Sequence, residues 1–251
     1  MDDIRENERI DDLQFKGLRL IQNSEHFCFG LDAVLLARFS SPRDTDRIID
    51  LGTGTGIIPV IVSGLCGSDN IKGLEIQECM CEMAGRSIAL NSLEGRVSII
   101  NGDIKCVSNL FERATFSLVI SNPPYIKHGN GIVNGDEQKA ISRHEVLCTL
   151  DDVCSAAGYL LSDKGRFAMV HKPERIIECF DAMRKYSIEP KKAQLIYPKE
   201  EKSPSAVLIE GVKGANAGFT FLRPIIVMDK NGSYTCSVND IYSGKGDEIF
   251  K

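Results

Sequence analysis

Short apolar runs alternate along this chain with longer segments in which apolar residues recur at helical spacing. That alternation is typical of βα repeats, which build a parallel sheet covered by helices. Buried strands are predicted over residues 47–51, 71–76, 97–101, 116–121, 166–171, 194–197 and 206–211. Helices are predicted over residues 57–65, 77–91, 150–161 and 172–186. The last two strands are joined by a short charged loop, which favours an antiparallel pair. The pattern as a whole predicts an α/β fold.

The chain has 251 residues, a length that one α/β domain can fill without splitting into two cores. We expect residues 1–46 to form an N-terminal cap, residues 47–213 the core of the domain and residues 214–251 a C-terminal extension. Residues 126–142 are rich in Gly, Asn, Lys and Asp and show no periodicity. This composition and the lack of periodicity predict a long loop, of the kind that often serves as a lid in compact domains.

Composition places the chain among globular proteins, with 43% hydrophobic and 26% charged residues. No apolar run approaches the roughly 20 residues that a membrane helix needs, and the polar N-terminus does not resemble a signal peptide. We therefore expect a cytoplasmic protein. The net charge of −5 does not favour nucleic-acid binding. Residues 185–230, however, hold eight basic and five acidic residues, which permits a modest positive patch on an acidic background.

The nine cysteines are scattered and include no C-x-x-C pair or other zinc-ligand spacing. Cys79 and Cys81 fall on a predicted helix and point to different faces. We expect reduced thiols that pack as small apolar side chains, and no metal site.

A glycine-rich turn follows the first buried strand, in the sequence Asp50-Leu51-Gly52-Thr53-Gly54-Thr55-Gly56. An open parallel sheet binds its ligand outside the carboxyl ends of its strands, where this turn lies. The glycines occur at every second residue, so the turn is not the G-x-G-x-x-G of dinucleotide-binding folds. The Lys and Ser/Thr of a phosphate-binding loop are also missing. The turn is therefore predicted to approach a ligand closely without cradling a phosphate.

Carboxylates follow the next two predicted strands. Glu75 comes about 20 residues after the glycines, where such folds place an acid that binds ribose hydroxyls. Asp103 follows the third strand, in Asn101-Gly102-Asp103-Ile104. Two acids at one sheet edge, together with the glycine turn, suit a ligand that has a ribose and an adenine but no phosphate. S-adenosylmethionine fits this description.

Asn122-Pro123-Pro124-Tyr125 follows the fourth strand and is the most specific motif of the chain. An exocyclic base amine or an amide nitrogen is a poor nucleophile because its lone pair is delocalised. The Asn122 side-chain oxygen and the Pro123 carbonyl are placed to accept hydrogen bonds from such a nitrogen, and the prolines would preorganise both acceptors. Tyr125 is suited to stack on a planar substrate. We therefore expect the chemistry to occur at this motif.

These motifs resemble those of class I S-adenosylmethionine-dependent methyltransferases that act on amino nitrogens. Residues 23–39, residues 142–149, the Lys172-Pro173-Glu174-Arg175 stretch and residues 203–214 extend the resemblance to the bacterial tRNA(Val) adenine-N6-methyltransferase family over nearly the whole chain. The resemblance implies a Rossmann-like, seven-stranded, mostly parallel sheet whose last strand is antiparallel. It also implies N6-methylation of the adenosine beside the anticodon, with tRNA as partner and S-adenosylhomocysteine as a product.

The resemblance also implies roles for individual residues. Those lining the methionine side of the cofactor are Gly52, Thr53, Gly54 and Gly56, with Asp50 beside them. Glu75 would bind the ribose, next to Ile76, and Asp103 and Ile104 the adenine. The segment that closes over the methionine contains Phe29, Gly30 and Asp32. The target amine would be bound and activated by Asn122, Pro123, Pro124 and Tyr125, and Asn122 would also contact the cofactor.

Arg143-His144-Glu145 follows the predicted loop, and two interpretations stay open: a cluster in which Arg143 binds substrate phosphate, or a helix start with solvated charges. His26, His128 and His171 have no nucleophile or metal partner in the sequence and are expected to be structural or exposed. Other activities compatible with the motifs are protein-glutamine N5-methylation and rRNA guanine-N2-methylation. An RNA-binding module that keeps the S-adenosylmethionine pocket without catalysis is the non-enzymatic alternative.

Overall fold

The computed structural model describes residues 4–24, 30–123 and 148–250. Its strands are β1 (Glu8–Asp12), β2 (Arg19–Asn23), β3 (Ile48–Leu51), β4 (Ile71–Glu75), β5 (Val97–Asn101), β6 (Phe116–Ser121), β7 (Leu161–His171), β8 (Ile188–Lys199), β9 (Ala206–Lys213), β10 (Thr220–Phe221) and β11 (Ile225–Met228). Its α-helices are α1 (Leu31–Phe39), α2 (Ile57–Leu65), α3 (Glu78–Leu90), α4 (Val107–Leu110), α6 (Leu150–Leu160), α7 (Ile176–Lys185) and α8 (Cys236–Tyr242).

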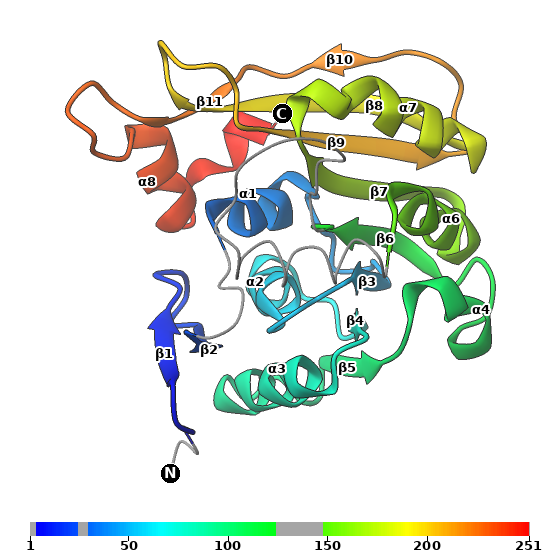
Figure 1. The fold of residues 1–251 in the computed structure, drawn as a ribbon, viewed down its shortest axis with the longest axis horizontal. Helices are drawn as coiled ribbons and strands as arrows, with labels where there is room; N and C mark the ends of the chain where they lie inside the picture. The colour runs from blue at the N-terminus through cyan, green and yellow to red at the C-terminus, as the bar shows by residue number, and fades with distance from the viewer. Residues whose placement is uncertain (1–3, 25–29, 124–147, 251) are drawn as a thin grey trace, which may run out of the picture.

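The described strands form one large twisted sheet and a separate β1–β2 hairpin (Figure 1). The order in the sheet is β10-β8-β9-β7-β6-β3-β4-β5, and β11 also pairs with β8. Strands β3 to β7 are mutually parallel where they pair, and β9 is antiparallel to both β7 and β8. The expected mostly parallel sheet with an antiparallel last strand is confirmed for β3 to β9. The expected count of seven is too low, because β10 and β11 add two short strands that cover the edge of β8.

The predicted elements lie where the apolar runs place them, but several strands are longer than predicted. The strands predicted over 97–101 and 116–121 match β5 and β6 to the residue. Strand β8 spans Ile188–Lys199, whereas only 194–197 was predicted. The prediction was too short because Pro190 and two lysines interrupt the apolar pattern in the first half of the strand. Pro190 lies at a shift in the β8–β9 register, the position at which a strand tolerates proline. The predicted helix over 172–186 begins as a single 3₁₀ turn, Pro173–Arg175, before α7.

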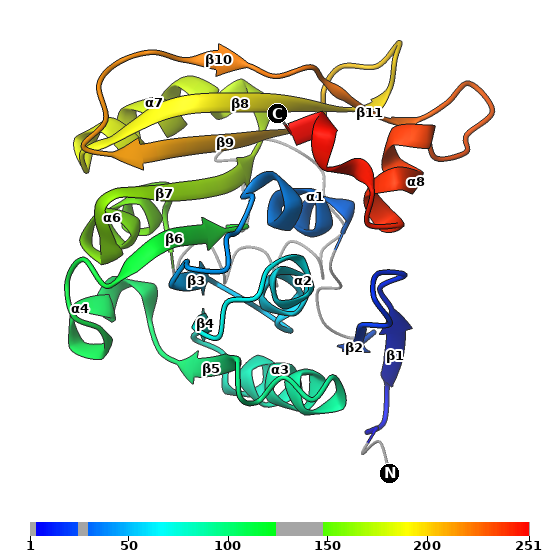
Figure 2. The ribbon, with the colours of Figure 1, turned by 180° about the vertical axis from the view of Figure 1, so that it is seen from behind.

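Two apolar clusters pack on opposite faces of the sheet. In β6, Leu118 and Ile120 face one cluster, with α1 and α2, whereas Val119 faces the other, with α6 and α7. All three side chains are fully buried, as the alternation of side chains along a strand requires. Figures 1 and 2 show α1 and α2 on one side of the sheet and α4 and α6 on the other. The helices cover the two faces of the sheet, and the carboxyl ends of its parallel strands lie together at one edge of the sheet.

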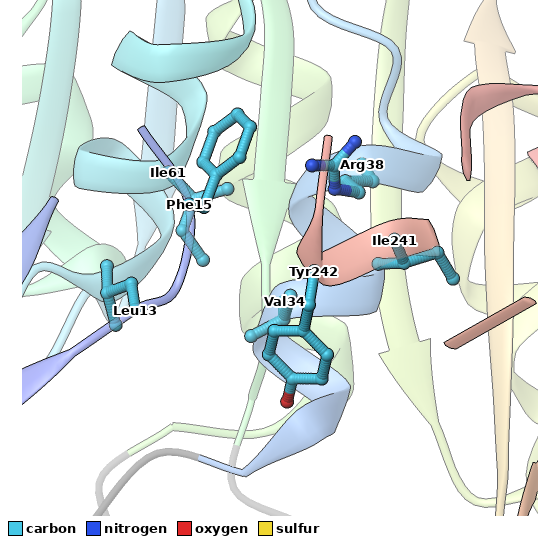
Figure 3. Close-up of a pocket in the computed structure, with 7 residues that line it drawn as sticks. All are labelled: Leu13, Phe15, Val34, Arg38, Ile61, Ile241 and Tyr242. Carbon is cyan, nitrogen blue, oxygen red and sulfur yellow. The ribbon is translucent and has the colours of Figure 1, made fainter. Parts of the chain in front are cut away.

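The N-terminal hairpin and the C-terminal helix α8 both pack against α1 and α2. A small apolar cavity lies between the turn of the β1–β2 hairpin, α1, α2 and α8, and its lining includes Phe15, Val34, Ile61 and Tyr242 (Figure 3). The Arg38 guanidinium lies 4.6 Å from the centre of the Phe15 ring, a cation–π contact. The hairpin turn is therefore part of the packed structure.

Gly64 of α2 is where the hairpin turn approaches this helix most closely. A Cβ atom added at Gly64 would lie 2.7 Å from Phe15 Cε1 and 2.9 Å from Leu18 Cδ1. Both side chains are buried, so we expect Gly64→Ala to lower the free energy of unfolding by about 1–3 kcal/mol. Gly85 of α3 is the matched control, because a Cβ there meets no atom within 4 Å. Gly85→Ala should be neutral or stabilising by up to about 1 kcal/mol. Equal urea midpoints for the two variants would contradict the proposed close packing.

Candidate active site

The register of the sheet brings the glycine turn and the Asn-Pro motif side by side. Leu51, the last residue of β3, is opposite Ser121, the last residue of β6. The Ser121 hydroxyl donates a 2.9 Å hydrogen bond to the Leu51 carbonyl oxygen, which fastens the two strand ends together. Gly52 and Asn122 are the next residues of the two parallel strands and therefore leave the sheet as neighbours. Asn122 is half-buried.

The glycine turn has a backbone that residues other than glycine adopt at a cost. Gly52, Gly54 and Gly56 have φ angles of +76°, +55° and +83°, in the left-handed region. The N–H groups of Gly52 and Thr53 both donate to the Leu74 carbonyl oxygen of β4, at 2.9 and 3.0 Å. The turn is therefore fixed against the neighbouring strand end.

The surface of this turn is open where a cofactor would approach it. A Cβ atom at Gly54 would meet nothing within 4 Å, and one at Gly52 would meet only Ile104 Cδ1, at 3.9 Å. Gly56 differs, since a Cβ there would lie 3.2 Å from the Cβ of Ala84 in α3. Gly52 and Gly54 thus form a cradle, while Gly56 lets α2 and α3 approach each other.

The Glu75 carboxylate reaches over the glycine turn from the end of β4. It accepts hydrogen bonds from the Gly54 N–H at 2.9 Å and the Gln77 N–H at 3.0 Å, and the side chain is buried. A carboxylate has about four acceptor positions, so these bonds leave capacity for ribose hydroxyls. Glu75 therefore both shapes the turn and presents negative charge beside it.

Asp103 and two isoleucines complete the same edge at β4 and β5. The Asp103 carboxylate accepts a 2.8 Å hydrogen bond from the Lys105 N–H and so caps the short helix that carries Ile104. Ile76, directly after Glu75, is 41% exposed, and Ile104 is half-buried. Apolar side chains beside an acceptor suit a flat base with an amino group.

Asp50 lies beneath the turn with no hydrogen bond to either carboxylate oxygen from the described residues. Burial raises its pKa to about 7, the nearby Thr53 hydroxyl opposes this rise, and the Glu75 charge adds to it. Thr53 is close to Asp50, but its hydroxyl makes no hydrogen bond of good geometry within the described part of the chain. A buried acid whose pKa lies close to 7, next to a turn that could bind a ligand, is typical of a binding site.

The raised pKa of Asp50 predicts a stability that depends on pH. Between about pH 4 and pH 7 the folded protein keeps a proton that the unfolded chain has released, so the contribution of Asp50 to stability falls as the pH rises. Asp50→Asn removes this effect and should be more stable than the natural chain by up to roughly 4 kcal/mol at pH 8. Urea unfolding of both proteins from pH 4 to pH 8 measures the difference. A difference that stays constant with pH would contradict the raised pKa.

Segments before and after the parallel strands also reach this edge. Asp32 lies in the first turn of α1, which begins after Gly30. Burial raises the pKa of Asp32, and the positive charge of Lys172 at the end of β7 opposes the rise. Since β7 is the neighbour of β6, the start of α1 lies near the strand end that carries Asn122. Pro123 is buried. Four predicted site residues lie outside the described residues: Phe29, Pro124, Tyr125 and Arg143.

Two side chains near this edge were not predicted from the sequence to belong to the site. Gln77 donates its backbone N–H to Glu75, and its side-chain amide lies 3.3 Å from the same oxygen. His171, at the end of β7, is 2% exposed, and its Nδ1 accepts a 2.8 Å hydrogen bond from the Lys172 N–H. Burial lowers the pKa of His171 to about 4, helped by the Arg175 charge, so its ring is neutral at physiological pH. His171 was expected to be structural or exposed, and its burial agrees with the structural alternative. A polar residue at a strand end was the available sequence signal for both.

The eight cysteines in the described part of the chain are free thiols. Burial raises the pKa of Cys148 and Cys179 to about 12, which disfavours the reactive thiolate.

Across residues 4–24, 30–123 and 148–250, no group of three or more His, Cys, Asp or Glu side chains is arranged to hold a metal ion. None of the described helices has both the length and the apolar character needed to cross a membrane.

Proteins of similar sequence are methyltransferases by name. A "tRNA1(Val) (adenine(37)-N6)-methyltransferase" of Porphyromonas gingivalis is 27% identical over 206 residues, which cover 80% of each chain. The protein of the same name from Bacteroides fragilis is 25% identical over 210 residues, 84% of each chain.

Solved structures show the same fold. A predicted O-methyltransferase from Agrobacterium tumefaciens superposes with a TM-score of 0.70 at 23% identity, covering 85% of this chain and 96% of that one. The 16S rRNA N2 G1207 methyltransferase of T. thermophilus, in complex with AdoMet and guanosine, superposes with a TM-score of 0.58 at 14% identity, over 83% of this chain and 51% of that one. The sequence profile of the family described as "Methyltransferase small domain" matches residues 30–185. Because this match covers more than half of the chain, the protein belongs to the methyltransferase small domain family.

Proposed function

We propose that this protein transfers a methyl group from S-adenosylmethionine to N6 of an adenine in tRNA, and that the target is the adenosine beside the anticodon of a valine tRNA. The observation that carries the proposal is the position of Asn122-Pro123 beside the open glycine cradle and the buried Glu75 carboxylate. The proposal is supported because acceptors suited to an amino group would then lie next to acceptors suited to a ribose. The names of the similar Porphyromonas and Bacteroides proteins support tRNA adenine as the substrate.

The residues present fit the proposed cofactor. A side chain in place of Gly52 or Gly54 would occupy the space that the cofactor needs, and Glu75 offers charged acceptors beside it. When bound, S-adenosylmethionine supplies a methyl group on a sulfonium, which is an excellent leaving group. Asn122 and Pro123 would hold the target amine through carbonyl oxygens and thereby aim its lone pair at the methyl carbon. Positioning and exclusion of water would then supply most of the rate, without a strong base before transfer. The target nitrogen would gain the methyl carbon as the carbon–sulfur bond breaks, and the methylated nitrogen, now acidic, would release its extra proton to water.

Other roles belong to the same proposal. Gly30 and Asp32, with Phe29, would close over the methionine end of the cofactor, Tyr125 would stack on the target adenine, and Arg143 would contact tRNA phosphate. The catalytic core would comprise residues 47–213, with residues 1–46 as a cap and residues 214–251 as an extension. Because tRNA is the proposed substrate, we place the enzyme in the cytoplasm.

The test is transfer of labelled methyl from S-adenosylmethionine to bulk tRNA that lacks native modification, followed by nucleoside analysis. The expected product is N6-methyladenosine, and digestion then maps its position. Label on guanine would overturn the proposed substrate, as would label found only on glutamine when a release factor is offered as a parallel acceptor. Binding of the cofactor without transfer to any of these acceptors would favour a non-catalytic module.

A further inference from the structure

The β1–β2 hairpin is fastened to α3 by polar contacts along its length. Two Arg86 nitrogens donate to the two Glu8 carboxylate oxygens at 2.6 and 2.8 Å. The hydrogen bond from Arg86 lowers the pKa of Glu8, so the pair stays charged at neutral pH. The Ile21 N–H donates to the Ser87 hydroxyl at 3.0 Å, and the Asn91 side chain bonds both backbone groups of Arg19. Strand β2 is therefore held at a fixed place over α3.

The last part of β2 reaches the glycine turn through one buried side chain. Gln22 is fully buried, and its Nε2 donates a 3.1 Å hydrogen bond to the Thr55 hydroxyl. Thr55 is 6% exposed and stands between Gly54 and Gly56, which both have positive φ angles. The contact joins residues 33 positions apart in the sequence and ties the N-terminal hairpin to the cofactor cradle.

The cradle needs such a tie because glycines supply no side chains to hold it. Within the described part of the chain, the turn is also held by the two N–H bonds to Leu74 and by the Gly54 N–H bond to Glu75. Gly54 and Thr55 are adjacent, so Glu75 and Gln22 hold neighbouring residues of the turn. A turn that is fixed before the ligand arrives does not lose ordering entropy on binding.

We propose that Gln22 is a positioning residue for the cofactor cradle, and that it acts through Thr55 to hold the turn in its binding shape. The proposal rests on the proposed use of S-adenosylmethionine. Its physical consequence is that loss of the Gln22–Thr55 bond weakens cofactor binding more than it affects the transfer step at saturating cofactor. The β1–β2 hairpin would then be part of the cofactor site, because Gln22 acts on the shape of the turn.

The experiment compares Gln22→Leu, Thr55→Val and Asn91→Ala in the full chain. Each of the first two removes one partner of the bond, and Thr55→Val keeps the shape of the side chain. Asn91→Ala loosens the hairpin elsewhere and is the control. We expect Gln22→Leu and Thr55→Val each to raise the calorimetric Kd for S-adenosylmethionine about tenfold, and the double variant to raise it no further. The KM for the cofactor should rise in parallel while kcat changes little. Asn91→Ala should lower Tm and leave Kd unchanged.

The outcomes separate this inference from the proposed function. An unchanged Kd in folded Gln22→Leu and Thr55→Val would overturn the positioning role while leaving the methyltransferase assignment intact. An equal rise of Kd in Asn91→Ala would also overturn it, since general loosening of the hairpin would then be the cause. Failure of the natural chain to bind S-adenosylmethionine at all would instead refute the proposed function.

Discussion

Replacing Asn122 by alanine is expected to reduce methyl transfer at least about a hundredfold while cofactor binding stays nearly intact. Asn122 follows the end of β6, beside Gly52, and its side-chain oxygen is proposed to accept a hydrogen bond from the target amine. That acceptor acts on the nitrogen as it becomes tetrahedral, so its loss should lower kcat rather than weaken cofactor binding. Single-turnover transfer to tRNA and calorimetric titration with S-adenosylmethionine measure the two effects separately.

Asn216→Ala provides the control for this substitution. Asn216 is exposed in the segment after β9, which ends at the edge of the sheet opposite to the site, so its loss should change neither measurement. If Asn122→Ala lost rate and cofactor affinity equally, misfolding would explain both losses and the assigned role would be wrong. Full activity of Asn122→Ala would mean that methyl transfer does not take place at the Asn-Pro motif.

The parallel core was predictable because its strands are continuous apolar runs with abrupt ends. Strand β6 is the clearest case, since its apolar run is followed at once by Asn122-Pro123, which no central ladder continues. The order of strands follows from the topology of βα repeats, so the glycine turn, Glu75 and Asp103 were expected at one edge. The register confirms the meeting of these strand ends.

The β1–β2 hairpin was not predicted, because its strands carry charge that masks their apolar positions. Strand β1 reads Glu-Arg-Ile-Asp-Asp, and its stabilising partners lie on α3, such as Arg86, which is 78 residues from Glu8. Contacts over such separations leave no local signal. For the same reason Gln22 gave no sign in the sequence that its amide would meet Thr55. The burial of the Asp50 carboxylate is likewise a property of packing around the turn.

Glu75 is the residue whose loss should weaken cofactor binding most. Its carboxylate accepts the Gly54 and Gln77 N–H groups and is proposed to accept ribose hydroxyls as well. Hydrogen bonds to a charged group contribute about 1.5–3 kcal/mol each, so Glu75→Ala should raise the Kd for S-adenosylmethionine about a hundredfold. Glu75→Gln keeps an acceptor oxygen for Gly54 but not the charge, and an increase of about tenfold is expected.

The contrast with Asn122 makes the Glu75 prediction specific. With Glu75→Ala, saturating cofactor should restore much of the transfer rate, because the amine acceptors are untouched; with Asn122→Ala, no cofactor concentration should restore it. Glu94→Ala is the matched control, since Glu94 is exposed in the loop before β5 and should leave Kd unchanged. An unchanged Kd in Glu75→Ala would mean that the carboxylate only shapes the turn. A loss of rate that saturating cofactor cannot repair would mean that a well-formed turn is needed for transfer itself, joining the cradle and the Asn-Pro motif into one catalytic unit.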